Sequence, residues 1–446
     1  MKTPSHAPRA LLLASLWSLS SWSLSSCGGG GSDGGGDSNE NPITERPARG
    51  SRACRVTHPV AEQTPRVWRS GPALVATRDG KAFLARQEAV TADPVIPATG
   101  QFIVGGLGVD GTFAAATPVP SGAMDELADI DGAPRGDGFA VVWGQQGKLR
   151  FAAFDAAGAS TIAAKDVLSV AEFIVGPRIA AGPDGGFGVV YTVVPNPNAR
   201  TLFFVLLGPD GEMRGTPHRL DETGTSMQYL TLPAPTIVGG TAGYAMIWRN
   251  LTEAQGGIEF AKVAPDGAEL VARRRISTPM SGSVVGASVD FDRPTTAMVE
   301  TSTGYLTAWV NTKGDGSSVW LTQLDASGVR QGPSAPLRAW TDKINEVEPS
   351  LVKYGDSVAV LWGSGSHIFV CGGCTPDHRI DLLLVDPSDL TPLSTVVSVA
   401  PPPREIKTGG LLRRQVVAIG PSLLATFDIT FHVHHLSATA TFGCDP

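Results

Sequence analysis

The sequence predicts an all-β fold, a β-propeller in which a unit of four short antiparallel strands repeats around an axis. Three observations predict it. A glycine followed by an apolar strand that ends on an aromatic residue returns at intervals of about 50 to 60 residues. A second apolar run follows each copy and closes on a turn rich in Asp and Gly, residues that suit a hairpin. After the N-terminal segment, no long stretch has helical periodicity.

The repeated stretch sets the number of blades. Five copies are clear, the last of them weaker, and they read Gly138–Trp143, Gly186–Tyr191, Gly243–Trp248, Gly304–Trp309 and Ser357–Trp362. Two degenerate copies flank them, so the count favours seven four-stranded blades, or six if one end copy forms no blade. Stacking around an axis buries the faces that each sheet alone would expose. We expect the terminal aromatic to pack between neighbouring blades. A pair of β-sandwiches is the main alternative.

The N-terminus has the features of an export signal. Lys2 and Arg9 supply positive charge, and Ala10–Leu24 is an apolar and Ser-containing segment too short to span a bilayer. We therefore assign residues 1–27 to a signal segment. The Gly- and Ser-rich residues 28–50 cannot bury enough apolar surface to order themselves and are predicted to form a flexible tether. Residues 51–446 then form the propeller domain.

The end of this segment resembles the lipobox of bacterial lipoproteins. It reads Leu24-Ser25-Ser26-Cys27, an apolar residue and two small residues before a cysteine. The resemblance implies cleavage before Cys27 and attachment of lipid to its sulfur, and thus an anchor in a membrane that the chain does not span. An ordinary secretory signal is the alternative. Gly28 stands where an Asp would favour the inner membrane, so we expect a cell-envelope protein of the outer membrane.

The charge balance excludes one class of partner. The formal net charge is −7, and the runs of Arg are short. Nucleic-acid binding, which depends on a positively charged surface, is therefore not expected. We expect the membrane as a partner through the lipid, an envelope protein or glycan as a further partner, and a monomer.

Five cysteines fit an exported chain. If Cys27 carries lipid, Cys54, Cys371, Cys374 and Cys444 remain, and four cysteines allow three pairings. We favour Cys371 with Cys374 and Cys54 with Cys444. The second pair would join the two ends of the folded chain, where a propeller must close its ring.

Two histidine clusters are candidate metal sites. His367 and His378 flank Cys371 and Cys374, and two thiolates with two imidazoles could hold a tetrahedral zinc ion. A local disulfide is favoured over zinc or a redox-active pair, because export leads to an oxidising compartment. His432 and His434 would share one face of a strand and form the second candidate. Histidines of a solvated strand are the alternative there, and no cofactor is predicted.

Alternating aspartates could place carboxylates at a rim of the propeller, although ordinary solvated turns are favoured. These residues are Asp129, Asp131, Asp290 and Asp292.

The repeat is also similar to the Gly-aromatic and Asp-x-x-Gly repeats of many bacterial surface propellers, over roughly residues 65 to 440. The resemblance concerns the fold, and no activity follows from it. Sequence motifs of hydrolases, metalloproteases and sialidases are missing. We therefore predict a non-enzymatic binding scaffold at the cell envelope. The alternatives are a hydrolase or lyase with a polar site in the channel, favoured by a ring of charged residues there, and a metal-binding module.

Overall fold

In the computed structural model the chain divides into two units, Met1–Ser38 and Asn39–Pro446, and all described residues belong to the second. The structure describes residues 42–49, 52–62, 72–89, 100–114, 117–124, 130–196, 199–223, 235–250, 257–277, 296–313, 316–338, 345–365, 379–400, 411–431 and 434–445. Within these ranges there are 28 strands, and one short 3-10 helix, η1 (Ile43–Glu45). No helix in the described part is long and apolar enough to cross a membrane.

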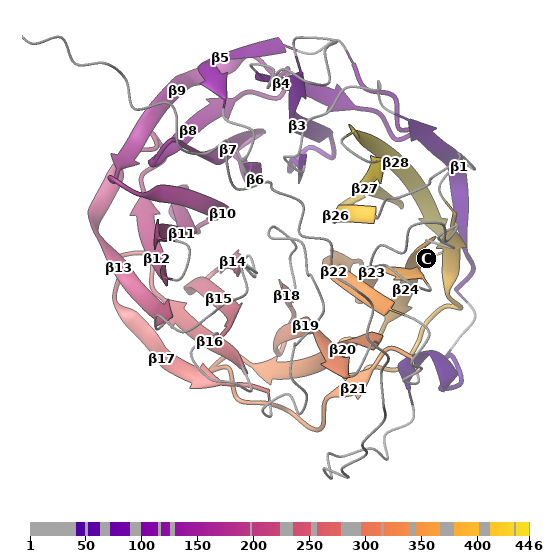
Figure 1. Ribbon diagram of the computed structural model, residues 1–446. Helices are drawn as coiled ribbons and strands as arrows, with labels where there is room; N and C mark the ends of the chain where they lie inside the picture. Colours follow the sequence, from indigo (N-terminus) through magenta and orange to yellow (C-terminus); the bar gives the residue numbers. More distant parts are fainter. Residues whose placement is uncertain are drawn as a thin grey trace, which may run out of the picture. The chain divides into compact units, whose positions relative to one another are not determined.

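The strands form seven four-stranded antiparallel blades in a ring, which confirms the predicted propeller (Figure 1). The strands of each blade are given from the innermost to the outermost. Blades 1 to 4 are β2–β5 (Ala73–Ala76, Ala82–Ala89, Gly100–Leu107, Thr117–Met124), β6–β9 (Ile130–Arg135, Gly138–Gln145, Lys148–Phe154, Ser160–Ser169), β10–β13 (Phe173–Ala181, Phe187–Asn196, Ala199–Leu207, Met213–Thr223) and β14–β17 (Thr236–Gly240, Gly243–Arg249, Ile258–Val263, Glu269–Arg275).

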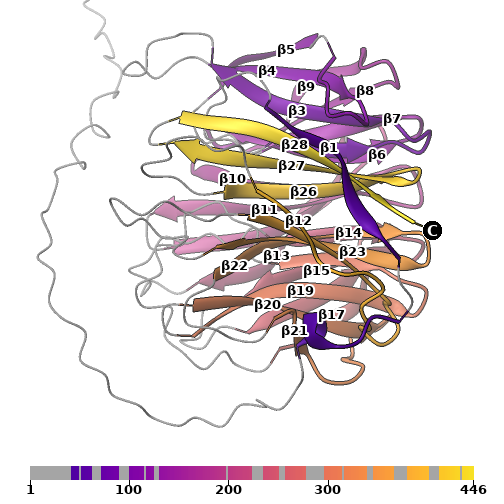
Figure 2. The ribbon, with the colours of Figure 1, turned by 90° about the vertical axis from the view of Figure 1, so that its right-hand side faces the viewer.

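Blades 5 to 7 have less regular outer strands. They are β18–β21 (Thr296–Glu300, Gly304–Lys313, Gly316–Asp325, Ala335–Pro336), β22–β25 (Asn345–Tyr354, Ser357–Gly365, Arg379–Val385, Val397–Val399) and β26–β28 (Leu411–Ile419, Ser422–Phe431, His434–Cys444) with β1 (Cys54–Glu62). A single parallel bridge, Ser317 to Asn345, links blades 5 and 6. The N-terminal strand β1 is thus the outer strand of the last blade, and the ring closes by pairing both ends of the chain (Figure 2).

The repeated stretch forms the second strand of its blade, and its aromatic residue packs between blades, as predicted. Trp143 of blade 2 is fully buried, and its ring centroid lies 5.1 Å from that of Phe102 in blade 1. Both belong to a core shared by these two blades. Trp362 likewise joins a core shared by blades 5 and 6. The repeat therefore builds the scaffold by filling the spaces between sheets.

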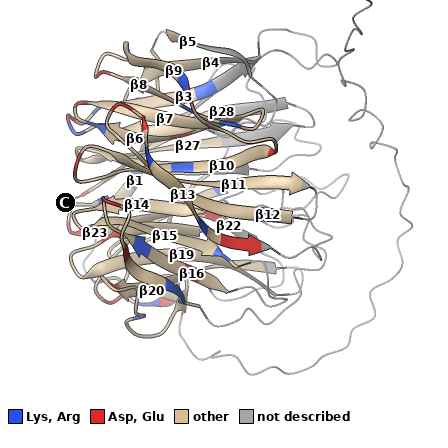
Figure 3. Cartoon of the chain, turned by 90° about the vertical axis from the view of Figure 1, so that its left-hand side faces the viewer, with Lys and Arg blue, Asp and Glu red and all other residues tan. Residues whose placement is uncertain are grey.

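The Asp-Gly turns connect the third and fourth strands. In blade 5, Asp325 accepts hydrogen bonds from the backbone N–H of Ser327 at 2.8 Å and of Val329 at 2.9 Å. Gly328 follows with φ of 74°, a conformation that favours glycine. Hydrogen bonds from Ser327 lower the pKa of Asp325. Figure 3 shows that acidic residues recur in the turns at the end of the ring where the C-terminus lies.

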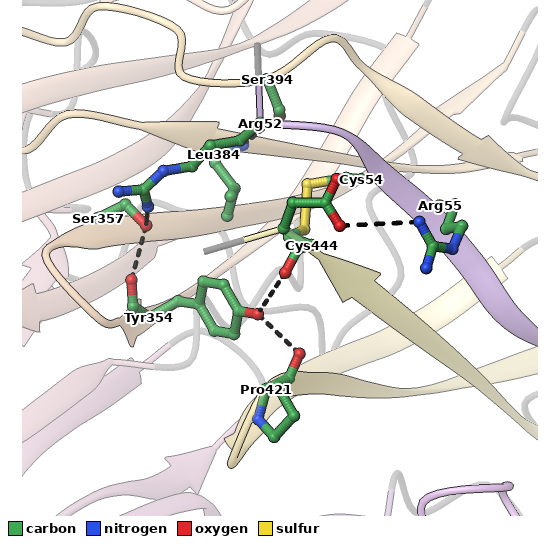
Figure 4. Close-up of a disulfide and its surroundings, with 10 residues drawn as sticks. Arg52, Cys54, Arg55, Tyr354, Ser357, Leu384, Ser394, Pro421 and Cys444 are labelled. Atoms are coloured by element: carbon green, nitrogen blue, oxygen red, sulfur yellow. Dashed lines mark hydrogen bonds and ion pairs between the residues drawn. A yellow bond between two sulfur atoms is a disulfide. The ribbon is translucent and has the colours of Figure 1, made fainter. Parts of the chain in front are cut away.

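The seam between blade 7 and its N-terminal strand carries the predicted disulfide. Cys54 and Cys444 face each other in the ladder between β1 and β28 and are bonded. The Tyr354 hydroxyl of blade 6 donates to the carbonyls of Pro421 at 2.7 Å and Cys444 at 3.1 Å (Figure 4). The closure thus combines a covalent bond, a strand ladder and a contact from the neighbouring blade.

Residues 42–49 and Arg52, which we call the strap, run along the outer edges of blades 5 and 6. They fall in or next to the segment for which the sequence predicts a tether. Three strap N–H groups donate to the blades, from Thr44 to Leu337 O at 2.9 Å, from Arg49 to Pro392 O at 2.8 Å and from Arg52 to Leu393 O at 3.2 Å. The outer strands of these two blades have 2 and 3 residues, against 7 to 11 in blades 1 to 4. The strap covers the edges that these short strands leave open.

Ile43 attaches the strap to the core and is fully buried against residues of blades 5 and 6. We expect Ile43→Ala to lower the free energy of unfolding by about 2–4 kcal/mol, the usual cost of truncating a buried isoleucine. Chemical denaturation measures this, and Val329→Ala, at a side chain that is 45% exposed, is the control. Equal stability of Ile43→Ala and the wild type would show that the strap does not hold the blades.

Candidate ligand site in the propeller channel

The described residues line a cavity of about 240 Å³ on the propeller axis that is partly open to solvent. Every blade contributes to its lining, which consists of Pro72, Ile130, Asp131, Gly132, Arg178, Ile179, Thr236, Ile237, Thr296, Ala297, Met298, Pro349, Ser350, Leu351 and Gln415. The first residues of β6, β14 and β18 are among them. In β10, β22 and β26 the lining residues Arg178, Ser350 and Gln415 lie within the strand, so the cavity lies at one level inside the channel.

The regular strand pairing of the repeat places polar side chains around this cavity. In five blades one polar lining residue pairs with the residue that immediately precedes the aromatic of the second strand. The pairs are Asp131 with Val142, Arg178 with Val190, Thr236 with Ile247, Ser350 with Leu361 and Gln415 with Thr426. Thr296 of blade 5 lies one step away, opposite Trp309. Because five blades share this register and Thr296 lies one residue from it, the polar residues of six blades converge near one level of the channel.

Asp131 lies at the centre of the polar contacts. Its carboxylate accepts a hydrogen bond from the backbone N–H of Ile179 at 2.9 Å and a longer one from Gln415 Nε2 at 3.4 Å. Burial raises the pKa of the Asp131 carboxyl, while the positive charge of Arg178 opposes the rise. A carboxylate of blade 2 thus connects the inner strands of blades 3 and 7.

Gln415 extends this connection across the seam. Its Oε1 accepts a hydrogen bond from the backbone N–H of Leu74 in blade 1 at 2.5 Å, while its Nε2 donates to Asp131. Blades 7, 1, 2 and 3 are therefore linked through two side chains. The channel wall closes the ring from inside, as the disulfide does from outside.

Hydroxyl groups line the opposite side of the cavity. Thr236 Oγ1 donates to the carbonyl of Thr296 at 2.8 Å and lies 3.0 Å from Thr296 Oγ1. Ser350 Oγ accepts from the backbone N–H of Val416 at 3.2 Å. Each hydroxyl joins neighbouring blades and keeps further hydrogen-bonding capacity, because a hydroxyl has one donor and two acceptor positions.

Two other buried carboxylates, Asp381 and Glu259, belong to ion-pair clusters. Asp381 is fully buried and accepts from Arg338 at 2.8 Å and Ser364 at 2.5 Å. Glu259 accepts from Asn250 at 3.0 Å and pairs with Arg275 at 3.4 Å. Both stand opposite a Trp of the repeat in the strand ladder. Their bonding partners indicate a structural role.

The described lining of the channel contains a single carboxylate. Glycoside hydrolysis usually needs two carboxyl groups about 5–9.5 Å apart. Asp131 is the one carboxylate among the described lining residues, and it already accepts two hydrogen bonds. Across the described residues, no group of three or more His, Cys, Asp or Glu could hold a metal ion.

Most of the site residues that the sequence suggested lie outside the described residues. These are Cys27, His367, Cys371, Cys374, His378, His432, Asp129, Asp290 and Asp292. His434 is placed only as a strand residue, opposite Phe431. The zinc and lipid sites and the pairing of Cys371 with Cys374 therefore stay predictions, while Cys54–Cys444 is confirmed. Of the four aspartates, Asp131 is described, and it faces the channel cavity.

Sequence reasoning missed the other polar lining residues, although a signal was present. In blades 3, 4 and 6 the polar residue directly follows a proline and precedes an aliphatic residue, as in Pro177-Arg178-Ile179, Pro235-Thr236-Ile237 and Pro349-Ser350-Leu351. When these three repeats are aligned, the residue after the proline is Arg, Thr or Ser, whereas the residue that follows it is always aliphatic. Variation at a fixed register of a repeat marks the surface that the scaffold leaves open for function.

Comparisons with known proteins identify the fold alone. No family model matches the sequence, and no curated protein matches it. The chain resembles the crystal structure of the polysaccharide lyase Uly1, with a TM-score of 0.51, 7% identity and coverage of 87% of this chain and 99% of that one. It also resembles a protein of unknown function from Dyadobacter fermentans (TM-score 0.49, 11% identity, coverage 88% and 99%) and the Trypanosoma rangeli sialidase (0.42, 9%, 89% and 59%). The similarity to Uly1 supports the propeller fold, and none of the three similarities assigns an activity.

Proposed function

We propose that this chain is an exported protein, anchored in the cell envelope through lipid on Cys27, that binds a small ligand in the channel of its propeller. The observation that carries the proposal is the convergence of polar side chains from six blades on one cavity of about 240 Å³. The lining combines a carboxylate, a guanidinium, an amide and three hydroxyls with aliphatic residues. Polar groups that converge on one cavity beside aliphatic residues can fix the orientation of a bound ligand.

A thermal-shift screen tests the proposal. The full chain, purified in detergent, is heated with monosaccharides, uronates, amino acids and nucleosides, each at a large excess. A ligand at ten times its Kd stabilises the folded chain by about 1.4 kcal/mol. We expect at least one compound to raise the Tm of the wild type and not that of Ser350→Phe, which fills the cavity. If Ser350→Phe does not fold, Thr236→Val takes its place.

Two outcomes contradict channel binding. One is that no compound in any class shifts the Tm. The other is that compounds shift the wild type and the cavity-filling variant equally, which would place binding elsewhere on the propeller.

One observation favours a second candidate, a hydrolase or lyase acting in the channel. Asp131 has a raised pKa, as a general acid requires, and lies in the cavity. Cleavage of nitrophenyl glycosides that is lost in Asp131→Asn and kept in Asp325→Asn would support it. The hydrogen bonds that already occupy Asp131 make it the weaker candidate.

A further inference from the structure

The charges of the described residues that line the cavity balance. Its described lining contains one acidic side chain, Asp131, and one basic side chain, Arg178, and the two interact favourably. An ion that enters such a site loses its hydration without meeting an excess of opposite charge. The lining therefore favours an uncharged ligand.

The hydrogen-bonding capacity includes both donors and acceptors. Ser350 accepts from Val416 N–H, so its own hydroxyl hydrogen remains to be donated. Thr236 donates to Thr296 O, so Thr296 donates to Thr236, and both oxygens keep acceptor capacity. Gln415 Nε2 has a second hydrogen beyond the one directed to Asp131. Groups that both donate and accept, namely hydroxyls, match this mixture best.

The volume of the cavity and its aliphatic residues further limit which ligands could bind. The cavity of about 240 Å³ lies below the range of roughly 300–1,000 Å³ for typical ligand pockets. Aliphatic side chains, among them Ile130, Ile237 and Leu351, alternate with the polar residues. They suit the C–H surface of a small ring, while the polar residues suit its substituents.

We infer that the channel binds a small, neutral, hydroxyl-rich molecule of the carbohydrate class, a monosaccharide or the terminal sugar of a glycan. The inference rests on the proposed channel-binding function. It assigns the two threonines and Ser350 the role of ligand partners, in addition to their links between blades.

The test is calorimetric titration of the full chain in detergent with glucose, galactose and mannose, and in parallel with glucuronate and galacturonate. We expect a neutral sugar to bind with an affinity that does not change between about 0.1 and 1 M salt, although the Debye length falls from roughly 10 to 3 Å. Thr236→Val and Ser350→Ala should each weaken binding about threefold to tenfold, the effect of losing one hydrogen bond. Thr303→Val, at an exposed turn, is the matched control and should bind like the wild type.

The outcomes separate this inference from the proposed function. If only uronates bind, and more weakly at high salt, the ligand class is wrong while channel binding stands. If none of the sugars binds but another compound of the thermal screen does, the class is again wrong. If a sugar binds and the channel variants do not change its affinity, the site is wrong. If nothing binds in either experiment, both proposals fail.

Discussion

Replacing Cys54 and Cys444 by serine is expected to lower the free energy of unfolding by about 3–5 kcal/mol. The disulfide joins residues 390 positions apart and holds the outer strand of blade 7 in place. For a loop of this length the chain-entropy model gives about 6 kcal/mol, and removal of native disulfides typically costs roughly 2–5 kcal/mol. The midpoint of guanidinium unfolding measures the loss.

Two comparisons make this result specific. The Cys371→Ser/Cys374→Ser variant should lose less, because any loop between those residues is short. Reductant should lower the midpoint of the wild type by more than that of the Cys54→Ser/Cys444→Ser variant, in which the predicted Cys371–Cys374 pair is what remains to be reduced. If the doubly substituted chain unfolds at the midpoint of the wild type, the ladder between β1 and β28 closes the ring without covalent help.

Replacing Asp131 by alanine is expected to lower the free energy of unfolding by about 2–4 kcal/mol. The substitution leaves the N–H of Ile179 and the side chain of Gln415 without their acceptor, and an orphaned buried donor costs about 1–3 kcal/mol. Relief from burying a carboxylate offsets part of this loss. Asp137→Ala, at an exposed turn, should change stability by less than about 0.5 kcal/mol.

A double-mutant cycle shows whether Asp131 stabilises the ring through its hydrogen bond with Gln415 of blade 7. Gln415→Leu removes the same link from the side of blade 7, so the two losses should fall short of additivity by about 0.5–3 kcal/mol. Additive losses would show that Asp131 stabilises the ring through Ile179 alone.

The raised pKa of Asp131 also predicts how the stability of Asp131→Asn, relative to the wild type, depends on pH. A raised pKa means that the folded chain binds more protons than the unfolded chain near this pKa. The contribution of Asp131 protonation to the free energy of unfolding is therefore fully present below the unfolded pKa of about 3.9. It is lost as the pH rises through the folded pKa. The stability difference between wild type and Asp131→Asn should thus shift in favour of the asparagine variant as the pH rises above about 4 and through the folded pKa. A constant difference across this window would contradict the raised pKa.

The scaffold could be predicted because it repeats. Gly138–Trp143 and its copies carry the strand period, the turn chemistry and the interface aromatic within a few residues, so local sequence contains the information. The disulfide Cys54–Cys444 could be predicted as well, because a propeller must join its first and last strands. The irregular parts were harder. The strap fills the edges left by the short β21 and β25, and a Gly-rich context conceals the packing of Ile43.

The channel site could not be derived from local sequence. Asp131 and Gln415 are 284 residues apart and meet only because seven inner strands face one axis at one register. The proline that precedes Arg178, Thr236 and Ser350 marks their position in the repeat, but it does not show that they meet residues of other blades.

The sequence by itself predicted an all-β repeat with about seven blades and favoured the pairing of its two ends, because these depend on local periodicity and on the need to close a ring, while the exported-type N-terminus stays a prediction. Only the tertiary structure decided which residues face the channel, that Asp131 and Gln415 link four blades, and that the strap completes blades 5 and 6. Those contacts join residues from different blades, and the distance between blades is set by the packing of the whole ring.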